Sequence, residues 1–372
     1  WILFRAEQVW YLTIYCFSSI GIVPIDPLMS NAAIDRSILP ANFEQEIVER
    51  DESTTMPLES YADEGEILAQ RYAIQSRLGR GGFGITFLAR NIYLPGQPLC
   101  VVKKLAPQFT DPQLIAIARK QFDLEALSLS RLSSHAQIPC LLDYFKLGTD
   151  LYLVEEYIPG VELTQIVSKK RKFTGSEVET FLIQMLRLLD YIHNHHLIHR
   201  DLKPQNIILC RTDRRFVLVD FGTVKEIATT FRQADRDSMA VGTPGFAPPE
   251  QLANRAVPAS DLYALGMTCI YLLTGKEPNQ FPTDDRTCEL IWADPAEISE
   301  GLSEIISKMI QIPLAERYHS ATAVLSALEN RSIRAKLRTY LDRKHAISNS
   351  QSSGDLNCNY PAVVHWALGN GW

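Results

Sequence analysis

The sequence has little that would mark a secreted, zinc-binding or nucleic-acid-coating protein. Its 372 residues contain seven cysteines, but these form no CxxC pair and no spacing that suits zinc. The formal net charge is −6 rather than strongly positive, which argues against a surface that coats nucleic acid. No internal repeat is present. We therefore expect reduced thiols, a cytoplasmic location and no nucleic acid among the partners.

Long apolar runs are also scarce, and the clearest one lies near the start. Residues 9–25 carry no charge, and their seventeen positions are at the lower limit for a membrane span. Three interpretations stay open: sequence translated from upstream of a native start at Met29 or Met56, a membrane anchor with the rest of the chain in the cytosol, or a packed helix. Residues 26–65 are rich in Pro, Ser, Asp and Glu and are predicted to be a linker, so that residues 1–65 form an N-terminal extension.

The most informative segment reads His-Arg-Asp-Leu-Lys-Pro-Gln-Asn and ends at Asn206, and an Asp-Phe-Gly triplet begins at Asp220. Hard oxygen ligands suit Mg²⁺, and Asp220 and Asn206 supply them. Asp201 is then free to orient a hydroxyl and accept its proton. Lys203 could neutralise charge on a transferring phosphate. Together these residues are the equipment that phosphoryl transfer needs.

Both motifs resemble the catalytic loop and the magnesium loop of protein kinases, in the serine/threonine form in which Lys follows the Asp by two positions. The resemblance implies an α+β, bilobal fold in a domain of residues 66–330. A small β-rich lobe with one helix would span residues 72–158, and a larger, mainly helical lobe would span residues 159–330. It also implies ATP and Mg²⁺ as cofactors, with Mn²⁺ as an alternative ion, and protein substrates phosphorylated on serine or threonine.

A glycine-rich segment upstream supports the same resemblance. Residues 79–84 read Gly-Arg-Gly-Gly-Phe-Gly between two apolar-rich stretches that are predicted strands. Alone this pattern could equally be a dinucleotide fingerprint, but that fold needs a helix after the last glycine, and a β-branched and aromatic strand follows here. The pattern resembles the kinase glycine-rich loop, with Thr86 where Val usually covers the adenine. The resemblance assigns ATP contacts to Leu78, Gly79, Arg80, Gly81, Gly82, Phe83, Gly84 and Thr86.

A lysine and a glutamate complete the upstream half of the predicted site. Lys103 lies in a short apolar strand at residues 99–105, where it could simply be a solvated strand end. Glu125, however, falls on the apolar stripe of a predicted helix at residues 112–131, and a carboxylate that faces a core is costly unless it is paired. Lys103 is the natural partner. The resemblance implies this ion pair and gives Lys103 the α- and β-phosphates of ATP.

Residues 151–160 are predicted to be a strand that runs into a turn, and by resemblance this is the hinge between the lobes. The hinge backbone at Glu156 and Ile158 would meet the adenine, and Glu162 would lie near the ribose. Glu155 occupies the gatekeeper position, where an apolar residue is common, and its charge leaves the selectivity for adenine analogues open.

Residues 242–250, Gly-Thr-Pro-Gly-Phe-Ala-Pro-Pro-Glu, resemble the end of a kinase activation segment. By resemblance Thr243 links this segment to the catalytic Asp and Lys, and Glu250 pairs with Arg317. With the glycine loop and the Gln-Ile-Pro stretch at residues 137–139, the segment is most similar to bacterial, and more specifically cyanobacterial, eukaryotic-like kinases.

Two further positions are predicted to be structural or regulatory. Asp261 precedes an apolar segment at residues 262–273, which is predicted to be a buried helix, and it is expected to cap that helix. By resemblance to the kinases, Asp261 would also brace the backbone of the catalytic loop. Arg200 would pair with a phosphate on residues 222–242, which contain several phosphorylatable hydroxyls.

The histidines near residue 195 and the basic segment at residues 331–344 each allow more than one interpretation. A capping box that starts at Ser176 is predicted to open a helix that ends at His195. The histidines near its end could be metal ligands, but no carboxylate or cysteine completes a set, and histidine also suits a helix C-terminus. Residues 331–344 are predicted to be a basic amphipathic helix, packed on the second lobe or bound to anionic lipid or an acidic partner, before a disordered tail to residue 372.

Two rival functions remain for comparison. A pseudokinase that acts as a nucleotide-binding scaffold predicts the loss of at least one core residue, and all of them are present: Lys103, Glu125, Asp201, Asn206 and Asp220. A kinase for small molecules shares the Asp and Asn chemistry, but the activation segment argues against it. The oligomeric state and the physiological substrate are not predicted.

Overall fold

The computed structural model describes residues 4–6, 9–11, 65–80, 84–107, 110–169, 171–222, 224–226, 242–287, 289–292 and 298–333. It divides into two units, residues 1–55 and 56–372. In the first unit, β1 (Phe4–Ala6) pairs antiparallel with β2 (Val9–Tyr11). The rest of the predicted anchor, the linker up to residue 64 and the tail beyond residue 333 lie outside the described residues. Within the described ranges, no helix has both the length and the hydropathy of a membrane span.

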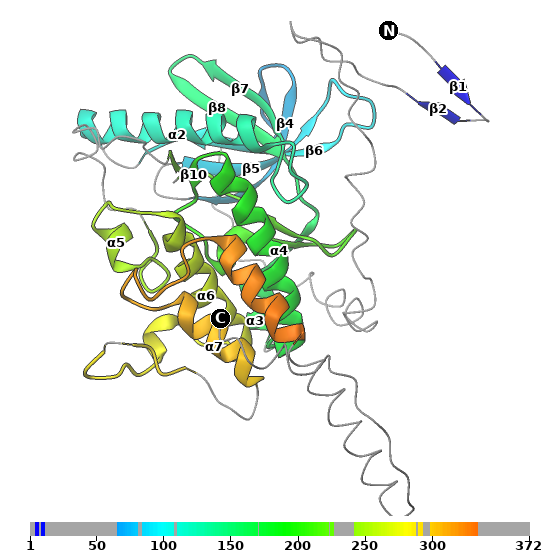
Figure 1. The fold of residues 1–372 in the computed structure, drawn as a ribbon. Helices are drawn as coiled ribbons and strands as arrows, with labels where there is room; N and C mark the ends of the chain where they lie inside the picture. The colour runs from blue at the N-terminus through cyan, green and yellow to red at the C-terminus, as the bar shows by residue number, and fades with distance from the viewer. Residues whose placement is uncertain are drawn as a thin grey trace, which may run out of the picture. The chain divides into compact units, whose positions relative to one another are not determined.

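The smaller lobe of the second unit is built on a six-stranded antiparallel sheet with the order β3-β4-β5-β6-β8-β7 (Figure 1). Its strands are β3 (Ile67–Leu68), β4 (Tyr72–Arg80), β5 (Gly84–Asn91), β6 (Leu99–Leu105), β7 (Leu141–Leu147) and β8 (Asp150–Glu156). The strands β4, β5, β6 and β8 coincide with apolar segments that were predicted to be strands, whereas β3 and β7 were not predicted.

Aromatic side chains form much of the core on this sheet. The rings of Tyr72 and Phe145 stack at 5.9 Å, and those of Phe145 and Tyr152 stack at 5.3 Å. The Tyr72 hydroxyl donates to Asp143 at 2.8 Å, so this buried ring keeps a partner for its polar end. The stack joins β4 to the β7–β8 hairpin, although β5 and β6 separate these strands in the sheet.

A long helix of this lobe, α2 (Pro112–Leu132), runs alongside the sheet and contacts β6 and β7 (Figure 1). Asp111 caps it by accepting the N–H of Gln113 at 2.8 Å. The predicted apolar stripe is confirmed, since Phe122 and Leu129 are buried together with Glu125. The helix therefore turns a carboxylate toward the sheet.

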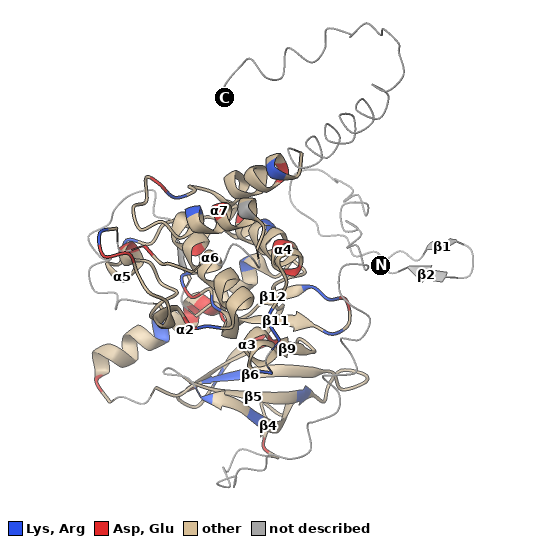
Figure 2. Ribbon diagram, turned by 90° about the horizontal axis from the view of Figure 1, so that it is seen from below, with Lys and Arg blue, Asp and Glu red and all other residues tan. Residues whose placement is uncertain are grey.

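The larger lobe is mainly helical, as predicted. Figure 2 shows α4, α6 and α7 on one side of three short strands, with the sheet of the smaller lobe on the other side. Its elements are β9 (Gly160–Glu162), α3 (Leu163–Ser168), α4 (Gly175–Asn194), β10 (Leu197–Ile198), β11 (Ile207–Cys210), β12 (Phe216–Leu218), β13 (Lys225–Glu226), α5 (Pro249–Leu252), α6 (Pro258–Thr274) and α7 (Glu300–Met309). Short 3₁₀ turns cover Pro204–Asn206 and Pro278–Gln280, and residues 321–333 are helical.

The start of α4 corrects one prediction. Thr174, and not Ser176, is the N-cap: its hydroxyl accepts the N–H of Glu177 at 3.3 Å, and Glu177 accepts the N–H of Thr174 at 2.8 Å. The reciprocal pair of a capping box is therefore present, two residues earlier than predicted. The N–H of Phe173 donates to Leu272 of α6 at 2.9 Å, which fixes where the chain can enter the helix.

Helix α6 is buried on all sides, as its uninterrupted apolar sequence predicts. Asp261 does not cap it, which corrects a second prediction. The N-cap position is Val257, whose N–H donates to the Ser260 hydroxyl at 3.1 Å, and Asp261 lies one residue further into the helix. Its carboxylate is therefore available to the neighbouring catalytic loop.

Candidate active site

The carboxylate of Asp201 is held by three side chains. Lys203 Nζ lies 2.8 Å from Asp201 Oδ2, and Asn206 Nδ2 donates to the same oxygen at 3.0 Å. The hydroxyl of Thr243 donates to Asp201 Oδ1 at 2.8 Å and accepts from Lys203 Nζ at 2.9 Å. Thr243 lies forty-two residues further along the chain, so these contacts join the catalytic loop to the predicted substrate-docking segment. These donors hold the Asp201 side chain in one rotamer.

Asn206 and Asp220 lie on neighbouring strand ends. Val219 donates its N–H to the carbonyl of Asn206 at 2.9 Å, which ties the two loops together. Asn206 Nδ2 donates twice to Asp201, and among the residues that the structure describes no donor reaches the amide oxygen of Asn206, which leaves that oxygen for another ligand. Although burial opposes ionisation, Lys103 and the N–H of Gly222 lower the pKa of Asp220. An ionised carboxylate and a free amide oxygen fit a hard divalent cation such as Mg²⁺.

The predicted ion pair between Lys103 and Glu125 is present. Lys103 Nζ lies 2.6 Å from Glu125 Oε1 and 3.2 Å from Glu155 Oε1. All three side chains are largely buried. Although burial opposes its charge, Glu125 and Glu155 raise the pKa of Lys103. Burial raises the pKa of Glu125 to about 7 and also raises that of Glu155, with Asp220 adding a further negative charge.

The described residues of the glycine-rich segment belong to the facing ends of β4 and β5. Leu78, Gly79 and Arg80 are exposed at the end of β4, and Gly84 begins β5. The loop residues Gly81, Gly82 and Phe83 lie outside the described residues. Thr86 pairs with Lys103 across the β5–β6 ladder, which places the strand after the loop directly beside the lysine.

The predicted hinge follows β8. The N–H of Glu156 donates to the carbonyl of Cys140 at 2.9 Å, and the Glu156 carboxylate accepts the N–H of Cys140 at 3.2 Å, so this residue is fixed at both ends. Ile158 is buried against Cys210 and Val217 of the larger lobe. Glu162 ends β9 and accepts a hydrogen bond from the Thr164 hydroxyl, and burial raises the pKa of Glu162.

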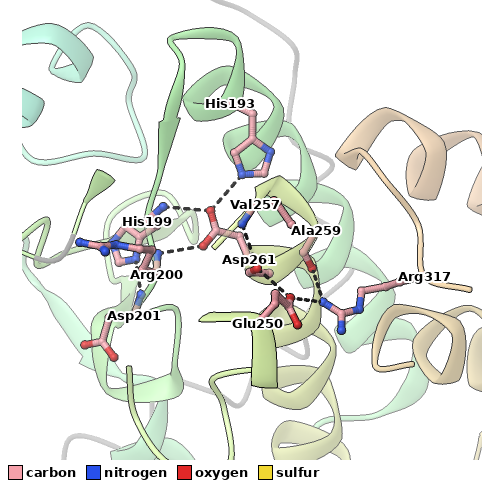
Figure 3. A network of polar contacts seen from close by, with 10 residues as sticks. His193, His199, Arg200, Asp201, Glu250, Val257, Ala259, Asp261 and Arg317 are labelled. Carbon is pink, nitrogen blue, oxygen red and sulfur yellow. Dashed lines mark hydrogen bonds and ion pairs between the residues drawn. The ribbon is translucent and has the colours of Figure 1, made fainter. Parts of the chain in front are cut away.

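A buried network holds the backbone of the catalytic loop (Figure 3). Asp261 Oδ2 accepts the N–H of His199 at 2.9 Å, and Oδ1 accepts the N–H of Arg200 at 2.9 Å. His193 Nε2 lies 2.9 Å from Asp261 Oδ2. The Asp261 side chain is fully buried, so these contacts stabilise its charge in place of solvent. The contacts hold Arg200 at a positive φ of 68°, which is unfavourable for a residue other than glycine.

A second network closes the end of the activation segment (Figure 3). Arg317 Nη1 lies 2.7 Å from Glu250 Oε1 and donates to the carbonyl of Ala259 at 3.1 Å. The Ser260 hydroxyl donates to the same Glu250 oxygen at 2.8 Å. Arg317 is 2% exposed, so breaking the pair would leave a charge in the core.

The chain matches the family model for the protein kinase domain over residues 72–327. The match contains every element of the site described above. The chain belongs to the protein kinase family. Its fold is accordingly the bilobal α+β kinase fold, and proteins of this family use ATP and a divalent metal ion.

Curated relatives of this chain include serine/threonine-protein kinases of cyanobacteria. Serine/threonine-protein kinase B of Synechocystis sp. is 47% identical over 265 residues, which cover 70% of this chain and 46% of the relative. Serine/threonine-protein kinase C of the same organism is 43% identical over 305 residues, 80% of this chain and 57% of the relative. Serine/threonine-protein kinase PknA of Nostoc sp. is 41% identical over 269 residues, 71% of this chain and 48% of the relative. The chain thus spans about half the length of these relatives.

Two contacts of the kinase domain were not predicted from the sequence. One is the ion pair of Glu155 with Lys103. The sequence pattern that could have predicted it is that Glu155 shares a strand face with the apolar Leu153, just as Glu125 lies on an apolar helix face. The other is the contact of His193 with Asp261; His193 lies in the last turn of α4, as predicted, but its partner was not predicted. No local signal joins two residues that are sixty-eight positions apart. Among the described residues, no group of three or more His, Cys, Asp or Glu side chains is placed to hold a metal ion.

Proposed function

We propose that this kinase domain transfers the terminal phosphoryl group of ATP to serine and threonine hydroxyls of protein substrates. The observation that carries the proposal is the anchoring of Asp201 by Lys203, Asn206 and Thr243. A base for an incoming hydroxyl must be held in place before the hydroxyl arrives, and these donors fix the position of the Asp201 carboxylate. Thr243 comes from the segment that would dock the substrate, so docking and positioning of the base would be coupled.

The remaining residues have roles that follow from their contacts. The acceptor hydroxyl would donate its hydrogen bond to Asp201, while Lys203 would neutralise charge on the phosphate. Lys103 would hold the α- and β-phosphates, with Glu125 keeping it in place. Asn206 and Asp220 would hold Mg²⁺, or Mn²⁺ as an alternative, and the bound ion would offset the charge of the phosphates.

The nucleotide would lie between the glycine-rich hairpin and the hinge. The backbone of Glu156 and of Ile158 would meet the adenine, and Glu162 would approach the ribose. Arg200 would pair with a phosphate added to the activation segment. Glu250, Arg317 and Asp261 would act as structural supports of the larger lobe. A cytoplasmic location fits a domain that consumes ATP.

The test is a transfer assay on the full chain with Mg²⁺, labelled ATP and a generic basic protein. We expect label on seryl or threonyl residues of the wild type and a loss of ~100-fold or more in the Asp201→Asn variant. Asp213→Asn is the matched control, because Asp213 is an exposed carboxylate that pairs with Arg215 in the same lobe. Its rate should equal that of the wild type.

The outcomes separate the rival functions. ATP binding without transfer to any acceptor would favour a nucleotide-binding scaffold and contradict the proposal. The presence of Lys103, Glu125, Asp201, Asn206 and Asp220 in one connected site argues against that outcome. Label that appears on small hydroxylated compounds but never on protein would instead favour a small-molecule kinase.

A further inference from the structure

Lys103 has two anionic partners, and they come from different elements of the smaller lobe. Glu125 belongs to α2 and lies 2.6 Å from Lys103 Nζ; Glu155 belongs to β8 and lies 3.2 Å away. The side chains of Glu125 and Glu155 are 7% and 5% exposed, so neither contact is diluted by solvent. The glutamate on the strand therefore contacts the lysine as a buried partner.

The register of the sheet explains why Glu155 can reach the lysine. Across the β6–β8 ladder Lys103 is opposite Leu153, and Val101 is opposite Glu155. Because side chains two residues apart on a strand share a face, Lys103 and Glu155 are diagonal neighbours on one face of the sheet. Backbone hydrogen bonds of β6 and β8 fix that separation. The contact with Glu125 depends instead on how α2 packs against the sheet.

The second oxygen of Glu155 indicates that stability alone does not explain this residue. Glu155 Oε2 is buried and has no hydrogen-bond partner among the described residues. A buried acceptor without a partner costs free energy, and an apolar side chain of similar size would avoid that cost. Glu125 and Asp220 are close to each other, since a Cβ on Gly222 would lie 3.1 Å from Glu125 Oε2 and 3.3 Å from Asp220 Oδ1, and Lys103 joins Glu155 to this pair of acids. A third acid in this cluster lowers the stability of the folded protein. Stability therefore does not account for Glu155, whereas a functional role would.

We propose that Glu155 is a positioning residue that holds Lys103 in the nucleotide site independently of Glu125. The strand partner keeps the lysine in place when the helix partner is lost, so the two carboxylates are partly redundant. This inference rests on the proposed function for the role of Lys103 as the ligand of the ATP phosphates. It differs from that function in making the smaller-lobe sheet, and not only helix α2, a determinant of phosphate binding.

A double-mutant cycle on the full chain tests the redundancy. Mg-ATP binding is measured for the wild type, Glu125→Gln, Glu155→Gln and the double variant. We expect each single change to weaken binding by less than about tenfold, and the double change to weaken it at least about tenfold more than the product of the singles. Additive effects, or no effect of Glu155→Gln in the Glu125→Gln background, would overturn the proposal.

The chain offers a matched control on the same two strands. Lys104 Nζ lies 3.0 Å from Asp150 Oδ2, and this pair also joins β6 to β8 but is more exposed, at 26% and 42%. We expect Asp150→Asn to leave Mg-ATP binding unchanged, both alone and in the Glu125→Gln background. A loss equal to that of Glu155→Gln would mean that any charge pair between these strands has the same effect, and would count against a specific role for Glu155.

Two further measurements separate positioning from a general structural role. Adenosine lacks the phosphates that Lys103 would bind, so its binding should be the same in all four proteins; a parallel loss of adenosine binding would contradict the proposal. Glu155→Met should unfold at the same denaturant concentration as the wild type or a higher one, because it removes the unpaired oxygen. A lower unfolding midpoint of Glu155→Met together with lost adenosine binding would indicate a general structural role for Glu155 and contradict the proposal. The cycle measures Mg-ATP binding and does not require phosphoryl transfer. A protein that binds ATP but transfers no phosphoryl group would therefore contradict the proposed function, while the binding data would still test the role of Glu155.

Discussion

Asp261→Asn should uncouple the catalytic loop from helix α6. The carboxylate is fully buried and accepts two backbone N–H groups, from His199 and Arg200, each at 2.9 Å. An asparagine has nearly the same shape but offers one acceptor oxygen and one NH₂ group. One backbone N–H would therefore face a donor and lose its partner. A lost charge-assisted hydrogen bond and one unpaired buried N–H together cost about 3 kcal/mol.

The loss should reach the reaction through the backbone of Arg200. Its φ of 68° is held by Asp261 and by Gln251, whose Nε2 donates to the Arg200 carbonyl at 2.5 Å. When one of these contacts weakens, the loop can relax toward a more favourable φ and carry Asp201 with it. A displacement near 1 Å can cost roughly 100-fold in rate. We therefore expect a lower kcat and an almost unchanged KM for ATP.

Denaturant unfolding and a steady-state phosphotransfer assay measure the two effects. Asp284→Asn is a matched control, since Asp284 also accepts two backbone N–H groups, at 2.8 and 2.9 Å, but lies on an exposed loop. It should leave both the unfolding midpoint and kcat unchanged. If Asp261→Asn had the wild-type midpoint and kcat, the inference that this carboxylate supports the loop would be refuted.

The effect of Asp261→Asn on the free energy of unfolding should depend on pH, and the pKa of Asp261 gives the direction of that dependence. Although burial opposes ionisation, His193 and then the backbone N–H of Arg200 lower the pKa of Asp261 below its ordinary value of 3.8. The carboxylate therefore adds stability above about pH 3.8, and this contribution is lost as the pH falls through the lower value of the folded protein. Urea unfolding should show a constant difference between wild type and Asp261→Asn from about pH 7 to 5, and a shrinking one below pH 4. A stability difference between wild type and Asp261→Asn that grows below pH 4 would contradict a lowered pKa for Asp261.

Three further changes test supports of the larger lobe. Arg317→Lys cannot keep the contacts of the guanidinium with Glu250 and the nearby carbonyls, and should lower the free energy of unfolding by about 3 kcal/mol in urea titrations; a loss below about 1 kcal/mol would contradict a buried role. Thr174→Ala removes the N-cap of α4 and should cost about 1 kcal/mol, whereas Ser176→Ala should cost almost nothing; the reverse order would restore the cap predicted from the sequence. Gly160→Ala would place a Cβ 2.6 Å from the carbonyl oxygen of Leu209, a backbone atom that cannot move cheaply, and should lower the thermal midpoint by several degrees; an unchanged midpoint would show that β9 and β11 can separate.

The pairing of Lys103 with Glu125 could be predicted because two independent patterns agreed. Glu125 lies on an apolar helical stripe, where a carboxylate needs a partner, and Lys103 lies in an apolar strand that needs one too. Glu155 is likewise a carboxylate on an apolar face, that of β8. It was not paired with Lys103 from the sequence, because a gatekeeper position can hold many residue types. Only the register of β6 against β8 shows that Glu155 reaches the lysine. Sequence patterns locate residues on faces, and register decides which faces meet.

The N-cap of α4 shows a different limit. Thr174 and Ser176 each precede a glutamate by three residues, so the sequence offers two overlapping capping boxes of similar strength. The choice depends on the hydrogen bond from Phe173 to Leu272 in α6, almost one hundred residues away in the sequence. A contact of this kind is tertiary, and no local pattern contains it.

The geometry around Asp201 depends on residues that follow it in the chain by forty or more positions. Thr243 holds the carboxylate, Gln251 holds the carbonyl of Arg200, and Asp261 holds the loop N–H groups. A positive φ at Arg200 is unfavourable in an isolated loop, so the loop cannot adopt this shape before the segment from residue 243 to 261 packs against it. The motif therefore specifies the chemistry, while the later segment specifies the geometry. It follows that variants of this segment should lower kcat even where they touch neither nucleotide nor acceptor.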